Sequence, residues 1–172
     1  MQAPKPHPLV ELAQEAIHEY LSRRIVMPPP VSLAGAFSRP AGTFVCLKKN
    51  GQLRGCVGTY EPARATVAEE VVHNAIASAT RDPRFSPVIL PELKEIDCSV
   101  DILSIPVPTA AQDLDPRRLG ILVVQGPRRG LLLPDLDGIQ TAEQQIREAK
   151  QKAGIMTDEA VELYSFTVQR FR

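Results

Sequence analysis

The sequence has no tryptophan, few aromatic residues and no excess of charge of either sign. Only 5% of its 172 residues are aromatic, and 20 Lys and Arg balance 20 Asp and Glu. A nucleic-acid-binding protein needs a basic surface, and one that binds single strands needs aromatic side chains on which bases stack. The composition therefore argues against a nucleic-acid partner, and any contact with an anion must be local.

Long apolar segments are lacking too. No run approaches the roughly 20 apolar residues of a membrane-spanning helix, and the N-terminal stretch has no apolar core of a signal peptide. These absences predict a cytoplasmic protein with no membrane partner. Glycine-rich loops of the kind that bind dinucleotides or phosphates are also absent, so no cofactor is expected.

Cysteine is scarce, and the three that occur are Cys46, Cys56 and Cys98. An odd number without the spacing of metal ligands argues against a disulfide framework and against a metal site. Thiols stay reduced in a cytosol. We therefore expect three free cysteines and no metal.

The chain does have enough residues for one complete core, with 44% hydrophobic residues. We expect a single domain over residues 1–172. Helical spacing of apolar residues and capping boxes predict helices over residues 9–21, 66–79 and 141–153, with a short helix near 158–163. Strands are expected over residues 43–48, 52–57, 96–102, 121–125, 131–133 and 164–168, and a long irregular loop is expected before Gly42.

Hairpins outnumber regular strand-helix-strand units in this order of elements. An α+β fold is therefore predicted, with an antiparallel or mixed sheet and helices packed on it. In the helix over residues 66–79, Asn74 falls near the apolar stripe and needs buried partners there, whereas His73 falls away from it.

The LRGCVG segment, residues 53–58, departs most from ordinary packing needs. Gly55 and Gly58 flank Cys56. Glycine inside a strand marks a bulge or a close approach of another backbone or a ligand. The segment is therefore predicted to form the site, with Cys56 accessible.

Two registers are open to the hairpin that contains this segment. A two-residue Asn50-Gly51 turn pairs Leu47 with Arg54, whereas a three-residue loop pairs Leu47 with Leu53. The second register is favoured because it places the apolar side chains on one face of the hairpin and the polar ones on the other. It places Val45, Leu47, Leu53 and Val57 toward the core and Cys46, Lys48, Arg54 and Cys56 on the other side.

Cys56 can be interpreted as a nucleophile or ligand-contacting thiol whose pKa is lowered by Arg54 and Lys48, or as a small buried residue. Arg54 could hold a carboxylate or phosphate, or form a salt bridge with Glu61 or Asp82. His73 is the one candidate imidazole base, although a residue off the apolar stripe is more often solvated.

Two further charged turns have two interpretations each. Asp82 and Arg84 either lock their turn to the LRGCVG hairpin or meet a ligand. Arg128 and Arg129 form either a solvated hairpin turn or a contact for a phosphate or a partner.

With these residues in view, the chain resembles the AMMECR family. The family's hexapeptide, Leu-Arg-Gly-Cys-(Ile or Val)-Gly, stands at residues 53–58, and the matching segments follow in the family's order from Leu9 to Phe171: GTFVCLKKNGQLRGCVGTYEP, NAIASATRDPRF, IDCSVDILS, GLLLP, KAGI and YSF. The resemblance implies an α+β fold with a larger and a smaller subdomain on antiparallel sheet. It also implies a genomic association with a Memo-like protein and a radical-SAM protein, in a system whose reaction is not settled.

One position departs from the family pattern. Lys150 stands where a cysteine is common, just ahead of the KAG element. Any role of a second family thiol is therefore in doubt for this chain.

Two functions compete. The favoured one is a binding or accessory module that recognises an anionic small molecule, peptide or modified macromolecule in a cleft at the LRGCVG segment. The alternative is a cysteine-dependent enzyme with Cys56 as nucleophile and Arg54 and His73 as further catalytic candidates. The binding module is favoured because no complete catalytic constellation can be read, and both a monomer and a homodimer stay open. The expected ligand contacts are Lys48, Arg54, Gly55, Cys56, Gly58, Thr59, Asp82 and Arg84.

Overall fold

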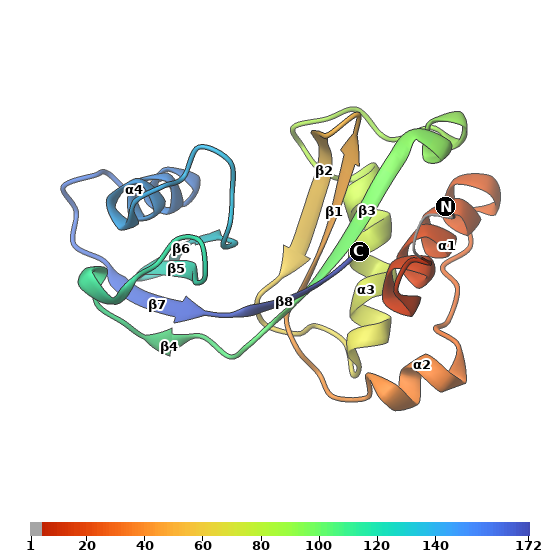
Figure 1. Ribbon diagram of the computed structural model, residues 1–172, viewed down its shortest axis with the longest axis horizontal. Helices are drawn as coiled ribbons and strands as arrows, with labels where there is room; N and C mark the ends of the chain where they lie inside the picture. The colour runs from red at the N-terminus through yellow and green to blue at the C-terminus, as the bar shows by residue number, and fades with distance from the viewer. Residues whose placement is uncertain (1–4) are drawn as a thin grey trace. The chain divides into compact units, whose positions relative to one another are not determined.

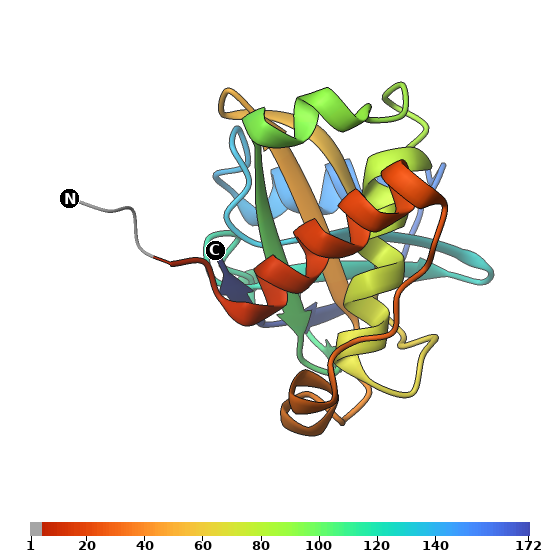
Figure 2. The ribbon, with the colours of Figure 1, turned by 90° about the vertical axis from the view of Figure 1, so that its right-hand side faces the viewer.

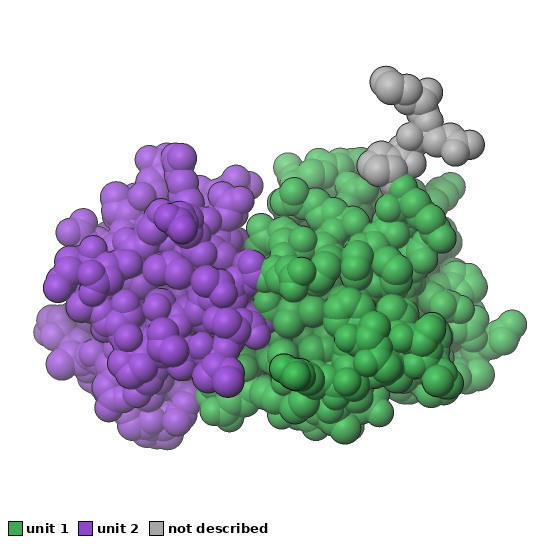
Figure 3. Space-filling model, turned by 60° about the horizontal axis from the view of Figure 1, so that its bottom comes forward, with its two compact units in different colours: residues 1–102, 169–172 green, residues 103–168 purple. Residues whose placement is uncertain are grey.

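The computed structural model describes residues 5–172, which form two compact units. Unit 1 comprises the described part of Met1–Ile102 together with Gln169–Arg172, and unit 2 is Leu103–Val168 (Figure 3). The sequence prediction that the N-terminal stretch is not a signal peptide falls partly on residues 1–4, which lie outside the described residues. Each unit has its own sheet and its own hydrophobic core.

Unit 1 is built on a four-stranded sheet in the order β2-β1-β3-β8. Its strands are β1 (Thr43–Lys49), β2 (Gln52–Thr59), β3 (Ile96–Leu103) and β8 (Val168–Phe171). Strand β1 pairs antiparallel with β2 and with β3, so β2 is an edge strand.

Helices α1 (Pro8–Arg23) and α3 (Val67–Thr80) lie on one face of this sheet (Figures 1 and 2). Both begin where the sequence predicts: Pro8 occupies the first turn of α1, and the Thr66 hydroxyl accepts from the Glu69 N–H at the start of α3. Their apolar stripes pack against Val45, Leu47 and Val100 of the strands, all 0% exposed.

Two short helices in unit 1 had no counterpart in the sequence prediction. Helix α2 (Val31–Ala36) lies within the segment expected to be irregular, where Leu33 and Phe37 pack on the core. The 3-10 helix η1 (Leu90–Glu95) leads into β3. Neither shows a strong apolar period, because each contributes only one or two side chains to the core.

The predicted register of the β1-β2 hairpin is wrong. Asn50 and Gly51, with φ angles of 53° and 78°, form a two-residue turn that pairs Lys49 with Gln52, and a bulge at Arg54 then shifts the pairing. Beyond the bulge Leu47 pairs with Gly55 and Cys46 with Cys56. The bulge keeps Leu47 inward without a longer loop, and it leaves Leu53 outward and 41% exposed.

Unit 2 has a second antiparallel sheet in the order β4-β7-β5-β6, with helix α4 (Ala142–Lys152) packed on β5 and β6. Its strands are β4 (Val107–Pro108), β5 (Gly120–Gln125), β6 (Arg128–Leu132) and β7 (Glu162–Phe166), and η2 (Ala111–Asp113) is a single 3-10 turn. The Thr141-Gln144 capping box of α4 is present as predicted. The short helix predicted near 158–163 is not formed, because this segment runs through a turn directly into β7.

The architecture confirms the predicted α+β class with antiparallel sheets and helices packed on them. Across residues 5–172, none of the helices has the length and apolar character needed to cross a membrane.

Candidate ligand-binding face beside the LRGCVG segment

A row of buried polar side chains on α3 holds the strand that carries the LRGCVG segment. Glu70, Asn74 and Ser78 recur every fourth residue, and Asp82 continues the spacing just after the helix; each is at most 5% exposed. Residues four apart lie on one face of a helix. These four residues, the polar row of α3, all bond to the β1-β2 hairpin.

The first two members bond to the far end of the hairpin. One carboxylate oxygen of Glu70 accepts from the Thr59 hydroxyl at 2.6 Å, and the other accepts from two backbone N–H groups of the following loop. The Asn74 amide donates to the carbonyl of Thr43 at 3.1 Å and to the Thr59 hydroxyl at 3.2 Å. The prediction that Asn74 is buried with partners is confirmed, and Thr59 points into the protein rather than toward a ligand.

Ser78 inserts its hydroxyl between the two strands. The hydroxyl accepts from the Val57 N–H at 2.9 Å and donates to the Val45 carbonyl at 2.7 Å. This insertion requires α3 to lie very close to β2, and a Cβ atom on Gly55 would collide with the backbone carbonyl of Ser78. The space at Gly55 is therefore filled by the protein's own helix.

Asp82 and Arg84 hold the backbone of Cys56 on the outer edge of β2. Asp82 Oδ2 accepts from the Cys56 N–H at 2.9 Å, and Arg84 Nη2 donates to the Cys56 carbonyl at 3.3 Å. The two side chains also pair with each other at 2.7 Å. The Arg84 hydrogen bond, aided by that of Cys56, holds the pKa of the Asp82 carboxyl well below its usual range. The geometry supports the interpretation that this turn locks onto the hairpin.

Arg54 lies on the opposite side of the sheet from the predicted one. Its guanidinium donates to both oxygens of Glu92, at 3.2 and 3.0 Å, and to the Ser86 carbonyl at 2.9 Å. Lys49, which alternation places on the inner face with Leu47, meets the same carboxylate at 3.4 Å. The partner of Arg54 is thus Glu92, not Glu61 or Asp82. The hydrogen bond from Arg54 lowers the pKa of the Glu92 carboxyl to about 2.

The outer face of the sheet carries two of the three cysteines. Cys46 and Cys56 are joined by a disulfide, with their Cα atoms 4.2 Å apart, and the free cysteine among the described residues is Cys98. The expectation of three reduced thiols is therefore wrong for Cys46 and Cys56. Directly opposed cysteines on neighbouring strands follow from the bulge, which the predicted register did not contain.

Lys48 and Gly58 share this outer face. Lys48 is exposed, and no hydrogen bond or ion pair within residues 5–172 holds its ammonium, although Asp97 is the residue opposite it on β3. Gly58 makes room for the Phe44 ring, which a Cβ atom would meet. Of the predicted ligand contacts, the face thus brings together Lys48, Cys56 and Gly58.

The structure separates His73 from Cys56. His73 belongs to α3, which covers the inner face, whereas the Cys56 sulfur is on the outer face. Partial burial, with the nearby Arg64, lowers the pKa of the imidazole. His73 therefore cannot reach the Cys56 sulfur as a base in this fold.

Several contacts lay outside the sequence prediction. Glu70 and Ser78 were missed although their four-residue spacing with Asn74 and Asp82 is visible in the sequence. No comparable spacing in the sequence pointed to Glu92 as the partner of Arg54. In unit 2, Arg128 donates to the Gly154 carbonyl at 2.8 Å and pairs with Glu159 at 2.9 Å, so the simple solvated-turn interpretation does not hold for it.

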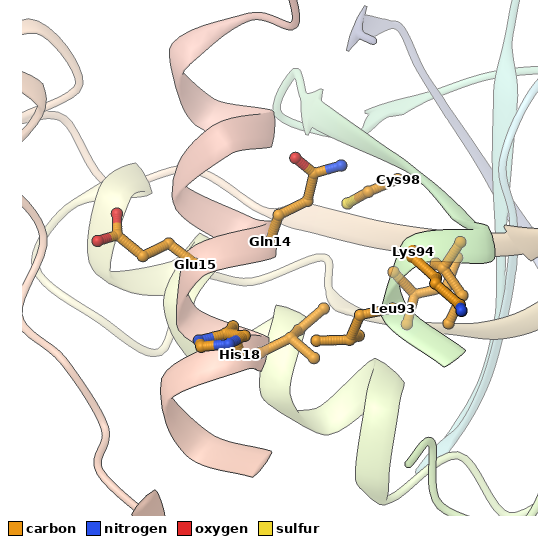
Figure 4. A pocket seen from close by; sticks show the side chains of 9 residues that line it. Gln14, Glu15, His18, Leu93, Lys94 and Cys98 are labelled. Atoms are coloured by element: carbon orange, nitrogen blue, oxygen red, sulfur yellow. The ribbon is translucent and has the colours of Figure 1, made fainter. Parts of the chain in front are cut away.

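A separate pocket of about 420 Å³ opens on the helix-covered side of unit 1. Figure 4 shows Gln14 and His18 of α1 on one side, Leu93 and Lys94 of η1 on the other, and Cys98 of β3 between them. Burial raises the pKa of the Cys98 thiol to about 12, which makes it a poor nucleophile. The described residues contain no cluster of three His, Cys, Asp or Glu that could hold a metal.

Comparison with known proteins places the chain in a family. The sequence profile described as AMMECR1 matches residues 10–171. The chain is 49% identical to a protein of Thermotoga maritima, over 96% of this chain and 98% of the relative. It is 40% identical to a protein of Clostridium acetobutylicum, of which it spans 36%. The crystal structure of an uncharacterized protein from Pyrococcus horikoshii matches with a TM-score of 0.88 and 31% identity, over 96% of this chain and 91% of that one.

Proposed function

Because this chain belongs to the AMMECR1 family, we propose that it is a cytoplasmic binding or accessory component of a modification system that includes a Memo-like and a radical-SAM protein. The binding surface is the outer face of the unit 1 sheet beside the LRGCVG segment. It receives an anionic group presented by a partner or a small ligand.

Lys48 carries this proposal. It is an exposed cation that no hydrogen bond or ion pair among the described residues holds, on the sheet face that α1 and α3 leave uncovered, two residues from Cys46. The other charged candidates are held internally: Arg54 by Glu92, and Asp82 by Arg84 and Cys56. A single available cation on a rigid strand suits recognition of an anion, whereas groups saturated by internal bonds are poorly placed to move protons.

The same geometry makes the enzyme alternative weaker. A nucleophile needs a free thiolate and a base within hydrogen-bond reach. The Cys56 sulfur is bonded to Cys46, and the three histidines of the chain, two on or next to α1 and one on α3, belong to the helix-covered side.

The binding role can be tested with the Memo-like and radical-SAM proteins encoded in the same genome. Biolayer interferometry with each purified protein should show binding that weakens as ionic strength rises. Lys48→Glu should weaken it by about tenfold or more. Lys94→Glu changes a comparably exposed lysine on the helix-covered side and should leave binding unchanged. Binding to neither protein, or equal binding by wild type and Lys48→Glu, would overturn the proposal.

A further inference from the structure

Three features of the molecule were left unused by the proposed binding role: the pocket at Cys98, the buried Lys150 and the Cys46–Cys56 disulfide. The pocket ends on a thiol that burial keeps protonated. Lys150 donates to the carbonyls of Thr157 and Glu159 at 2.8 and 2.6 Å, which satisfies it as a brace of the loop after α4. The disulfide carries an inference further than either.

The Cys46–Cys56 bond joins residues that the sheet already holds face to face. Cys46 and Cys56 are direct partners in the ladder, and Val45–Val57 and Leu47–Gly55 pair on either side of them. The fold therefore keeps the two sulfurs adjacent whether or not they are bonded. A pair held in place by its neighbours can open and close without rearranging the backbone.

The two bonded cysteines are also more exposed than the third. Both cysteines are half-buried on the outer face, away from α1 and α3, whereas Cys98 is 8% exposed on the inner face. Cys98 of β3 lies opposite Leu47 of β1, and its side chain points to the core. The Cys98 thiol therefore cannot exchange with the bonded pair unless the protein unfolds. The chain thus separates one dithiol pair from one inert thiol.

The two sulfurs are not equivalent. Cys56 lies on the edge strand β2, whereas Cys46 lies on β1 between β2 and β3, opposite Ser99. A thiolate attacks a disulfide sulfur in line with the bond that breaks, so attack on Cys56 comes from the open edge and attack on Cys46 must come across β3. Lys48 shares this face two residues from Cys46, and a cation near a departing thiolate favours its charged form.

We propose that Cys46 and Cys56 form a thiol–disulfide exchange site whose co-substrate is a dithiol reductant. One thiolate of the reductant attacks the Cys56 sulfur, the bond to Cys46 breaks, and Cys46 leaves as a thiolate that takes up a proton. The second thiol of the reductant, as a thiolate, then attacks the reductant's own sulfur in the mixed disulfide, the bond to Cys56 breaks, and Cys56 leaves as a thiolate that takes up a proton. The net exchange converts the protein disulfide and a dithiol into a protein dithiol and a disulfide of the reductant. This site does not depend on the proposed binding role.

The first test is reversible reduction of the folded protein. The chain is incubated with dithiothreitol without denaturant, quenched with iodoacetamide and mapped by mass spectrometry, with circular dichroism in parallel. We expect labels on Cys46 and Cys56, none on Cys98, an unchanged spectrum, and recovery of the bond in oxidised glutathione. A bond that is reduced only when the protein unfolds, or labelling of Cys98 ahead of the pair, would overturn the proposal.

The second test resolves the order of attack. The oxidised protein is incubated with reduced glutathione, whose thiolate attacks one of the two bonded sulfurs, and the mixed disulfide is trapped with iodoacetamide and mapped by mass spectrometry. The glutathione adduct should lie on Cys56 and the alkyl label on Cys46, in about tenfold excess over the reverse arrangement. Cys98→Ala is the matched control and should give the wild-type distribution. An equal distribution of the adduct between Cys46 and Cys56 would contradict the edge-attack geometry.

Discussion

Asp82 accepts the backbone N–H of Cys56 at 2.9 Å, and this bond ties the loop after α3 to the strand that carries the LRGCVG segment. Because the Asp82 side chain is 3% exposed and paired with Arg84, the bond is formed by a largely buried carboxylate.

Asp82→Asn should lower the free energy of unfolding at pH 7 by about 2 kcal/mol, because a charge-assisted bond to Arg84 and Cys56 is replaced by a neutral one. Urea denaturation measures the change. Asp97→Asn, at an exposed position of β3 where no hydrogen bond or ion pair from residues 5–172 holds the carboxylate, is the control and should change stability by less than about 0.5 kcal/mol.

The same variant should change the acid response. The folded-state pKa of Asp82 lies below its unfolded value, so its contribution is present above the unfolded pKa and is lost as pH falls. Wild-type stability should therefore decrease from about pH 5 downward, and Asp82→Asn should flatten that slope. An equally steep slope in the variant would show that Asp82 is not the group that titrates.

Arg54→Met should return the Glu92 pKa from about 2 toward its ordinary value of 4.5, because the guanidinium is the main cause of the shift. An NMR titration that follows the Glu92 carboxyl resonance measures this pKa directly. The side chains of this pair are 15% and 16% exposed, and we expect unfolding to become easier by about 1–3 kcal/mol. Arg54→Lys keeps the charge but not the two-pronged geometry, and should recover only part of both effects.

Gly55→Ala should destabilise unit 1 by about 1–3 kcal/mol or more, because the new methyl group meets the Ser78 backbone, which cannot move without shifting α3. Gly35→Ala is the matched control. It lies in α2 with no atom within 4 Å of an added Cβ, and should be neutral or stabilising. Thermal melts of both variants measure the difference, and similar melting temperatures would show that α3 does not press on β2.

Ser78→Ala removes the hydroxyl that bridges Val57 and Val45, and should lower stability by about 1–2 kcal/mol. Hydrogen exchange should then accelerate at the Val57 amide before it does at other positions of β2. Ser32→Ala, at an exposed position of α2, should change neither quantity.

The helices were predictable because their information is local. The stripes of α1 and α3 and the capping box of α4 lie within a few consecutive residues, and the structure confirms all three helices. The register of the β1-β2 hairpin could not be predicted in the same way. A two-residue turn followed by a bulge at Arg54 satisfies the same alternation of apolar and polar residues as a longer loop. The disulfide was missed for the same reason, since it depends on that register.

Long-range polar contacts were predictable only in part. The spacing of Glu70, Asn74, Ser78 and Asp82 could have indicated a polar helix face, although not what it binds. Arg54 finds Glu92 38 residues away on a short 3-10 helix without a periodic pattern. A pairing of this kind is set by how η1 packs, which no local sequence signal records.

The position of Asp82 and Arg84 beside β2 has a consequence for how this sheet can associate. An edge strand normally offers unpaired N–H and C=O groups that another chain can use to extend the sheet. At Cys56 both groups are already taken by side chains of the same protein. The strand is thereby protected against end-to-end sheet growth and aggregation at this point, and a partner that recognises the LRGCVG segment must approach its outer face rather than add a strand of its own.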